Sequence, residues 1–423
     1  MTRSLLFYAA ALLFPLPLVA ILNTQLTDAA RVRMVISLGL IAYCWWLAAI
    51  LLSVRPTWLD RWVGLPQIYA LHGSLGIAAL VVAYLHIDNN YAHNMLARDV
   101  GNWAFYLSLG VAAYSILFMS GWLADRLLLV ARIKRGLERL LDHRIAVWLH
   151  RLNLVAVALI AVHVHLIVQI NRHLVFMIAF DLVTLAVLGV YAWKKWIAPD
   201  SFLTGTVREN RALNASTRQV AIALDEPSSR IRPGDFFFLR FETDGIPRER
   251  HPFSLTGDDQ GLATFTIRQI GDFTRAVPQV PVGTRSRLEG PFGRFDGILK
   301  ETPAQIPLVF IGMGAGVAPL LSLAAGYAGD RAITLLWSVH RDDDAYYRSL
   351  IEDFENANPD RFDAHIQVGR FTRDRLAALL SAEQIGKAQF VVVGPAQAVL
   401  AAQRHLRRLG VSHRRIHHER LTM

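Results

Sequence analysis

The sequence is poor in cysteine, with Cys44 as its only one among 423 residues. A single cysteine cannot form an intrachain disulfide, and it cannot supply the set of thiolates that holds an iron–sulfur cluster. Any electron carrier in this protein must therefore be organic or a haem. Cys44 lies inside a long apolar run, where we expect it to serve only in packing.

Charged residues are scarce as well, at 18% of the chain against roughly 25% in typical soluble domains, whereas 53% of the residues are hydrophobic. The long apolar runs are concentrated in about the first 200 residues, and a spanning helix needs about 20 residues. We therefore predict six membrane spans, the first of them an uncleaved helix and not a signal peptide. The predicted spans lie near residues 5–21, 34–53, 67–87, 102–122, 145–170 and 174–193.

Basic residues predict the orientation of these spans. Several Lys and Arg residues follow the fourth span between positions 126 and 144, and the sixth span runs into Lys194 and Lys195. Cytoplasmic loops carry such an excess of Lys and Arg. We expect a multi-pass protein of the cell membrane whose two termini both face the cytoplasm. The soluble half has no basic stripe interleaved with aromatics, so we expect no nucleic-acid partner.

Histidines occur where apolar residues are expected. The third span contains His72 and His86, and the fifth contains His150, His163 and His165. Ionisable residues inside a membrane usually mark a function. His72 and His86 are separated by almost four helical turns, which places them on one helix face about 21 Å apart along the axis.

On the fifth span, either His163 or His165 could be paired with His150, and helical periodicity alone favours His165. Two histidine pairs would then face each other at two depths. This arrangement suits two stacked b-type haems, each iron held between two imidazoles. One alternative is that the histidines only form hydrogen bonds between helices. A divalent-metal transporter, the other alternative, would need carboxylates, and Asp181 is the only acid that looks buried in these spans.

The second half predicts two soluble domains. Short β-like runs alternate with turns from about Phe202 to Gly293, as in a small barrel. From Ile306 onward, apolar strands alternate with helical stretches, as in a parallel α/β domain. Its first strand ends in "GMGAGVAP", whose glycines would let a diphosphate approach the N-terminus of a helix.

Five motifs occur here in the order seen in the ferredoxin-NADP reductase superfamily: "HPFSLTG", "IRQIGDFT", "EGPFG", "GMGAGVAPLLS" and "VVVGP". Together with the histidine-bearing spans, nearly the whole chain resembles the NADPH oxidase or ferric-reductase-like transmembrane family. The resemblance implies a six-helix membrane bundle over residues 1–198, a β-barrel FAD-binding domain over 199–302 and an α/β NAD(P)H-binding domain over 303–423.

The resemblance also implies roles for single residues. The flavin-binding residues would be Arg250, His251, Pro252, Phe253, Ser254, Arg268, Gly271, Asp272 and Thr274. Among these, His251, Phe253 and Ser254 would touch the reactive flavin ring. The nucleotide-binding residues would be Gly312, Gly314, Gly316, Pro319, Arg341, Gly394, Pro395 and Glu419. Arg341 favours NADPH over NADH, unless it pairs instead with Asp342, Asp343 or Asp344.

The haem ligands implied by the resemblance are His72 with His150 on the inner side and His86 with His163 on the outer side. The ligand spacing of the family selects His163 over His165, although either the helix would then have to be locally distorted or the ligands would have to reach round it. Basic side chains near the outer surface could hold haem propionates or an anionic chelate, or could simply contact lipid headgroups. They are Arg31, Arg33, His93, Arg98 and His173.

Three positions depart from the family pattern. Val393 replaces a cysteine before Gly394, and Leu421 stands where relatives usually place an aromatic over the flavin. Asn90 stands where oxygen-reducing relatives have a histidine, which weakens an oxygen-reducing role.

The function that the resemblance implies is electron transfer from cytosolic NAD(P)H through FAD and two haems to an acceptor on the outer face. The acceptor would be a ferric chelate or oxygen. Two alternatives stay open at this point: electron transfer to a quinone or a partner protein, and a membrane transport or sensor protein without catalysis.

Overall fold

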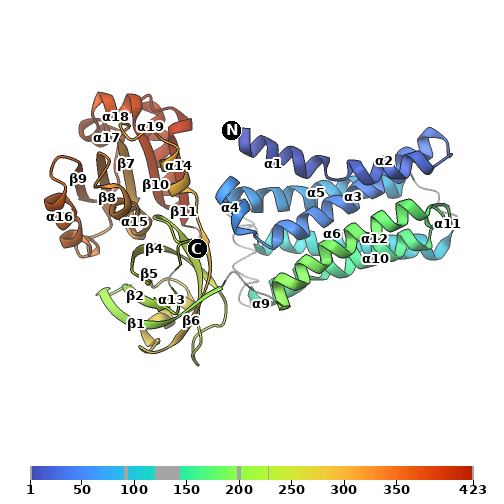
Figure 1. Ribbon diagram of the computed structural model, residues 1–423, viewed down its shortest axis with the longest axis horizontal. Helices are drawn as coiled ribbons and strands as arrows, with labels where there is room; N and C mark the ends of the chain where they lie inside the picture. The colour runs from blue at the N-terminus through green and yellow to red at the C-terminus, as the bar shows by residue number, and fades with distance from the viewer. Residues whose placement is uncertain (1, 90–93, 120–142, 198–201, 227, 422–423) are drawn as a thin grey trace. The chain divides into compact units, whose positions relative to one another are not determined.

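The computed structural model describes residues 2–89, 94–119, 143–197, 202–226 and 228–421. The chain divides into two compact units. Unit 1 consists of residues Met1–Pro56 and Leu65–Pro199, and unit 2 of residues Thr57–Gly64 and Asp200–Met423. Unit 1 is helical, whereas unit 2 contains a barrel and a parallel sheet (Figure 1).

Unit 1 is built from long helices that lie lengthwise along one another (Figure 1). Its helices are α1 (Thr2–Leu13), α2 (Leu16–Gln25), α3 (Ala30–Ser53), α5 (Leu65–Asp88), α6 (Met95–Met119), α9 (His143–His150), α10 (Leu152–Leu166), α11 (Val168–Asn171), α12 (Leu174–Ala192) and η1 (Trp193–Ile197).

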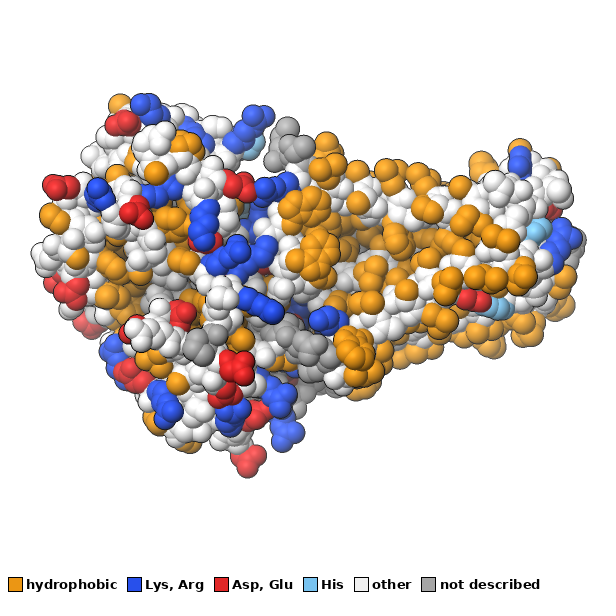
Figure 2. Space-filling view, viewed as in Figure 1, with side chains coloured by type: hydrophobic (Ala, Val, Ile, Leu, Met, Phe, Trp, Pro, Cys, Tyr) orange, Lys and Arg blue, Asp and Glu red, His pale blue; other side chains and the backbone are white. Residues whose placement is uncertain are grey.

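Five helical segments of the described chain are long and apolar enough to cross a membrane: Arg3–Gln25, Ala30–Ser53, Leu65–Asp88, Val147–Leu166 and Leu174–Ile197. They coincide with five of the six predicted spans. The remaining prediction, residues 102–122, falls on the 25-residue helix α6 and on residues beyond Met119 that are not described. Hydrophobic side chains dominate the face of unit 1 in Figure 2, while the face of unit 2 carries interspersed acids and bases.

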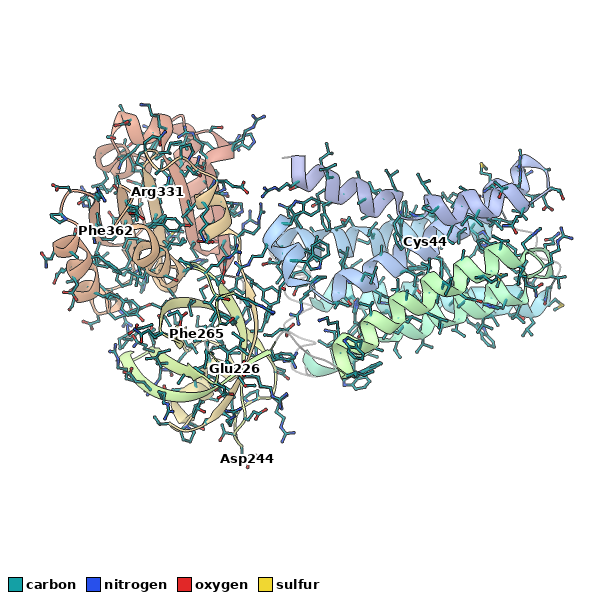
Figure 3. The ribbon with its side chains drawn as sticks, viewed as in Figure 1. Cys44, Glu226, Asp244, Phe265, Arg331 and Phe362 are labelled. Carbon is teal, nitrogen blue, oxygen red and sulfur yellow. The ribbon has the colours of Figure 1, made fainter. Side chains whose placement is uncertain are left out.

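The interior of unit 1 is an apolar cluster formed mainly by α2, α3, α10 and α12. Cys44, labelled in Figure 3, is fully buried in this cluster. Because burial raises the cost of forming a thiolate and the surroundings are apolar, the packing role predicted for Cys44 fits its position.

The first half of unit 2 is a closed six-stranded barrel with the strand order β1-β2-β5-β4-β3-β6. Its elements are β1 (Phe202–Asn214), β2 (Thr217–Leu224), β3 (Phe236–Phe241), β4 (His251–Asp259), β5 (Leu262–Arg268), α13 (Asp272–Ala276), η2 (Val277–Gln279) and β6 (Arg285–Phe292). Alternate residues point inward, as in β3, so that Phe237, Leu239 and Phe265 fill the interior (Figure 3 labels Phe265).

The second half of unit 2 is a five-stranded parallel sheet in the order β11-β10-β7-β8-β9. Its strands are β7 (Leu308–Met313), β8 (Ile333–Val339), β9 (Phe362–Val368), β10 (Gln389–Pro395) and β11 (Ile416–Leu421). Its helices are α14 (Phe295–Lys300), η3 (Gly314–Gly316), α15 (Val317–Tyr327), η4 (Asp342–Asp344), α16 (Arg348–Ala357), α17 (Arg373–Leu379), α18 (Ala382–Lys387), α19 (Ala396–Arg408) and η5 (His413–Arg415). The predicted fold class, apolar helices with a barrel and an α/β domain, is confirmed.

The short helix α4 (Thr57–Val63) lies in sequence between two apolar segments but groups with unit 2. Asp60 accepts a hydrogen bond from the backbone N–H of Gly293 at 2.7 Å. Arg61 donates to the buried carboxylate of Asp235 and to the carbonyl of Gly293. Arg61 is thus a structural partner of a buried acid.

Candidate functional site

Four of the predicted histidines form two pairs in unit 1. The ring centres of His72 and His150 are 5.8 Å apart, and those of His86 and His163 are 6.4 Å apart. An imidazole nitrogen bound to a transition metal lies about 2 Å from it, so two axial imidazoles on one iron have ring centres about 6 Å apart. Both pairs therefore have the separation that one iron between two imidazoles requires.

The Nδ1 atoms of these histidines form hydrogen bonds with neighbouring helices. His72 reaches the carbonyl of Ala49 at 2.9 Å, and His86 reaches that of Val35 at 2.8 Å. An imidazole that donates from Nδ1 carries its lone pair on Nε2, the nitrogen that can then bind a metal.

The second histidines of the two pairs differ from each other in their partners. His163 Nδ1 reaches the carbonyl of Ala97 at 2.6 Å, whereas His150 Nδ1 reaches the hydroxyl of Ser115 at 2.8 Å. Three of the four rings thus use a backbone carbonyl, and one uses a side chain.

His165 lies outside this arrangement. Its Nδ1 is within 2.8 Å of the carbonyl of Ala161 on its own helix, and its Nε2 is 3.3 Å from Asp181. Both ring nitrogens therefore face oxygen atoms of the protein, and the geometry favours His163 over His165 as the partner of His86.

The helix that carries His150 and His163 is interrupted between them. Helix α9 ends at His150 and α10 begins at Leu152, and the Arg151 N–H is shared between the carbonyls of Val147 and Trp148. A tighter turn of this kind rotates the chain more per residue than an α-helix does. The helix is therefore locally distorted between the two histidines, which is one of the two ways in which His163 could be brought opposite His86.

A cavity of about 900 Å³ surrounds the His86–His163 pair, at the upper end of the roughly 300–1,000 Å³ range of ligand and cofactor pockets. Its wall is mostly apolar, but two bases, Arg31 and Arg98, and one acid, Asp28, also line it. A porphyrin has an apolar ring and anionic propionates, so this combination of surfaces fits one. His93, which the sequence also suggested for the outer surface, and Asn90, which departs there from the pattern of oxygen-reducing relatives, lie outside the described residues.

Two glycines make room for the rings of this pair. A Cβ atom on Gly39 would lie 2.9 Å from His86 Nδ1, and one on Gly101 would lie 2.8 Å from His163 Nδ1. Both separations are shorter than real Cβ contacts, so each ring lies directly against a neighbouring helix backbone.

In unit 2, the predicted flavin-contacting residues lie at the start of β4. The ring of His251 is 4.4 Å from that of Phe273, and the ring of Phe253 is 6.0 Å from it in a stacked arrangement. Ser254 is largely buried in the same strand. Phe273 was not singled out from the sequence, although it lies inside the motif "IRQIGDFT".

The loop around Phe273 is held by Thr274, whose hydroxyl accepts hydrogen bonds from the N–H groups of Ile270 and Gly271 at 2.8 and 3.0 Å. Asp272 is the first residue of the short helix α13 that follows. The predicted residues of this motif therefore form one compact turn.

Arg250 and Pro252 flank His251. Arg250 donates to the buried carboxylate of Glu289 at 3.1 Å, and its guanidinium lies 4.1 Å from the ring centre of Phe202. Pro252 is exposed on β4. In this structure Arg250 thus serves to join β4 and β6 within the barrel.

The glycine motif lies between β7 and α15. Gly314 has a φ of +57°, and a Cβ atom on Gly316 would lie 2.2 Å from the carbonyl oxygen of Val393, so only glycine fits there. A Cβ atom on Gly312 would lie 3.2 Å from the Val317 Cα, and Pro319 is the third residue of α15. The turn therefore exposes backbone at the N-terminal end of a helix, where anions bind.

Residues from the barrel and the sheet meet at this turn. A guanidinium nitrogen of Arg268, at the end of β5, would lie 3.8 Å from a Cβ atom built on Gly314. The carbonyl of Gly314 accepts a hydrogen bond from the indole N–H of Trp337 at 2.9 Å. An arginine is thus held beside the backbone that would face a diphosphate.

Arg341 follows β8 and is well exposed, with its Nε 4.0 Å from Asp344. The Asp344 carboxylate also accepts hydrogen bonds from the Arg341 backbone and from Asn214. The pairing with Asp344 that we considered from the sequence is therefore present at the limit of an ion pair, and the guanidinium is still accessible.

The carboxyl ends of β10 and β11 complete the site. Gly394 pairs with Arg420 and Pro395 with Leu421 in parallel register, and Glu419 pairs with Val393. Burial, together with the carboxylates of Asp60 and Asp235, raises the pKa of Glu419 to about 7. A carboxyl group that titrates near neutral pH can hold or release a proton there.

Comparison with known proteins gives partial matches. No protein-family model matches the sequence. The chain is 26% identical over 197 residues to the electron transfer subunit of dihydroorotate dehydrogenase B (NAD(+)) from Fusobacterium nucleatum, covering 45% of this chain and 74% of that protein. It is 32% identical over 133 residues to the ferredoxin–NAD(P)(+) reductase component of the naphthalene 1,2-dioxygenase system from Pseudomonas putida, covering 30% of this chain and 38% of that protein.

Among solved structures, a cytochrome P450 reductase from Amycolatopsis matches with 24% identity and a TM-score of 0.47, covering 52% of this chain and 70% of that one. The two sequence matches show that the chain is similar, over part of its length, to an electron transfer subunit and to a reductase component.

Proposed function

We propose that this protein is a membrane oxidoreductase that uses NAD(P)H, FAD and two b-type haems to reduce an acceptor at the outer face of the cell membrane. The observation that carries the proposal is the arrangement of His72 with His150 and of His86 with His163, at separations of 5.8 and 6.4 Å. Among the described residues no group of three or more His, Cys, Asp or Glu could hold a metal ion. Pairs of histidines suit haem in particular, because the porphyrin supplies the other four ligands.

Unit 2 would supply the flavin and nucleotide sites. His251, Phe253 and Ser254 would line the flavin ring, Arg268 would neutralise its diphosphate, and the turn at Gly314 would receive NAD(P)H. The two curated relatives support this assignment, since both are named as reductase or electron-transfer components. When bound, FAD and haem supply the conversion of a two-electron hydride donor into single-electron transfer.

The proposed orientation places both termini in the cytoplasm, and it rests on the Lys and Arg residues of the loops. The proposed acceptor is a ferric chelate or oxygen. Each haem would be held by two histidines, so the acceptor would have to take electrons from the haem without binding to its iron. Arg31 and Arg98 line the cavity beside His86 and His163 together with one acid, Asp28, and this excess of positive charge favours an anionic acceptor such as ferric citrate.

Haem content tests the proposal. We expect the detergent-purified protein to contain about two b haems per chain in a pyridine haemochrome assay, and the NAD(P)H-reduced form to be reoxidised by ferric citrate or air. A haem-free protein that binds NAD(P)H would contradict the proposal and would favour the alternative of a non-enzymatic sensor. Reoxidation only by an added quinone or protein would assign a different acceptor to the same cofactor chain.

A further inference from the structure

Helices α3, α5, α6 and α10 contain the same arrangement twice. His72 and His86 on α5 contact the carbonyls of Ala49 and Val35 on α3, and the interval between the two histidines equals the interval between the two carbonyls. Helix α6 is related to α10 in the same way, because His163 contacts the carbonyl of Ala97.

The repeat predicts a partner for His150. Val111 follows Ala97 on α6 by as many residues as Ala49 follows Val35 on α3. The Val111 carbonyl would therefore be the counterpart of the Ala49 carbonyl. His150 Nδ1 instead contacts the hydroxyl of Ser115 at 2.8 Å, and that hydroxyl is 2.7 Å from the Val111 carbonyl, to which it donates. The serine hydroxyl therefore lies between the imidazole and the expected carbonyl.

The difference has a geometric cause. The interval from His150 to His163 is one residue shorter than that from His72 to His86, which shifts the ring by about 1.5 Å along the helix. The Ser115 hydroxyl can accept a hydrogen bond from the imidazole N–H and donate its own proton to the Val111 carbonyl. It therefore spans the extra distance. The other hairpin has Ser53 at the equivalent position, one turn after Ala49, but the Ser53 hydroxyl donates to the Ile50 carbonyl at 2.7 Å and His72 needs no bridge.

From this comparison we infer that Ser115 is a positioning residue that fixes the tautomer and orientation of His150 and tunes the haem that His150 would bind. The inference rests on the function proposed above. A hydrogen bond to the second ring nitrogen makes an imidazole a better electron donor to its metal, and a better donor stabilises the oxidised iron. Removing the hydroxyl should therefore raise the midpoint potential of one haem and leave the other unchanged.

Three variants test the role of Ser115 by spectroelectrochemical titration of the two haems, with low-temperature electron paramagnetic resonance as a second readout. Ser115→Ala should shift one midpoint potential upward, or lose about one haem per chain. Ser115→Thr, which keeps a hydroxyl able to bond the carbonyl one turn earlier, should retain the wild-type values. Ser53→Ala is the matched control and should leave both midpoints unchanged.

Other outcomes would overturn the inference. Unchanged midpoints in Ser115→Ala would show that the hydroxyl does not tune the haem. Equal shifts of both haems, or a shift of the same size in Ser53→Ala, would show a general effect on the helices. If the wild-type protein contains two haems and the variants give these results, only the role of Ser115 is contradicted. A wild-type protein without haem would contradict the proposed function as well.

Discussion

At the scale of single residues, the choice between His163 and His165 decides how the second haem would be held. The sequence periodicity favours His165, but the structure directs its Nε2 to Asp181 and places His163 opposite His86. The geometry thus favours His163 as the partner of His86, and the assignment can be tested directly.

We predict that His163→Ala loses about one of two haems, because one iron is left with a single protein ligand. His165→Ala should retain both, since its ring bonds only protein oxygen atoms in the structure described. Haem per protein, measured by pyridine haemochrome assay, compares the two variants. Loss of haem in His165→Ala alone would reverse the assignment.

Glu419 predicts a pH dependence of stability. Its pKa of about 7 in the folded protein exceeds the ordinary value of 4.5. Between these two pH values the folded state therefore binds more protons than the unfolded state. The free energy of unfolding should therefore fall as the pH rises from about 4.5 to about 7, by roughly 1–3 kcal/mol for this group.

Glu419→Gln should flatten that part of the curve, because glutamine does not ionise. Thermal midpoints measured by calorimetry from about pH 5 to about pH 8 give the comparison, with the exposed Glu383→Gln as control. An unchanged slope in Glu419→Gln would mean that this carboxyl group titrates normally.

At the scale of elements, the backbone of helix α6 packs against His163, the proposed haem ligand. Gly101→Ala would put a Cβ atom 2.8 Å from His163 Nδ1, whereas the space beside Gly110 on the same helix is open within 4 Å. Gly101→Ala should therefore alter the midpoint potential or the content of one haem. Gly110→Ala should leave the haems unchanged and stabilise the helix by up to about 1 kcal/mol. Equal effects of the two substitutions would contradict this packing.

Helix α4 is predicted to stabilise unit 2 through Arg61. Arg61→Ala leaves the buried carboxylate of Asp235 without its guanidinium, which typically costs about 3–5 kcal/mol. The thermal midpoint of unit 2 should fall accordingly. Adding Asp235→Asn to this variant should recover part of the loss, because the buried charge is removed. No recovery would show that Arg61 acts mainly through its bonds to backbone carbonyls.

At the scale of the whole molecule, the sequence predicted the apolar helices, the barrel and the parallel sheet because their periodicities are strong and local. It also indicated His72, His86 and His150, since histidines stand out in apolar runs. Arg268 and Gly314, which motifs singled out separately, lie side by side in unit 2.

What could not be predicted depends on contacts between distant segments. Ser115 is an ordinary polar residue in an apolar helix until His150 is placed beside it. The association of α4 with unit 2 depends on Asp235, which is far from Arg61 in the sequence. Phe273 could have been suspected from its motif, but only the structure places its ring against those of His251 and Phe253.

The central claim is that NAD(P)H reduces haem within this one chain. It is tested most directly by an anaerobic absorption spectrum of the FAD-loaded, detergent-purified protein before and after addition of NADPH. We predict that the bands of a reduced b-type haem appear, and that His163→Ala shows them at about half the wild-type amplitude. The claim would be contradicted if the haem stays oxidised after addition of NADPH and of NADH although dithionite reduces it.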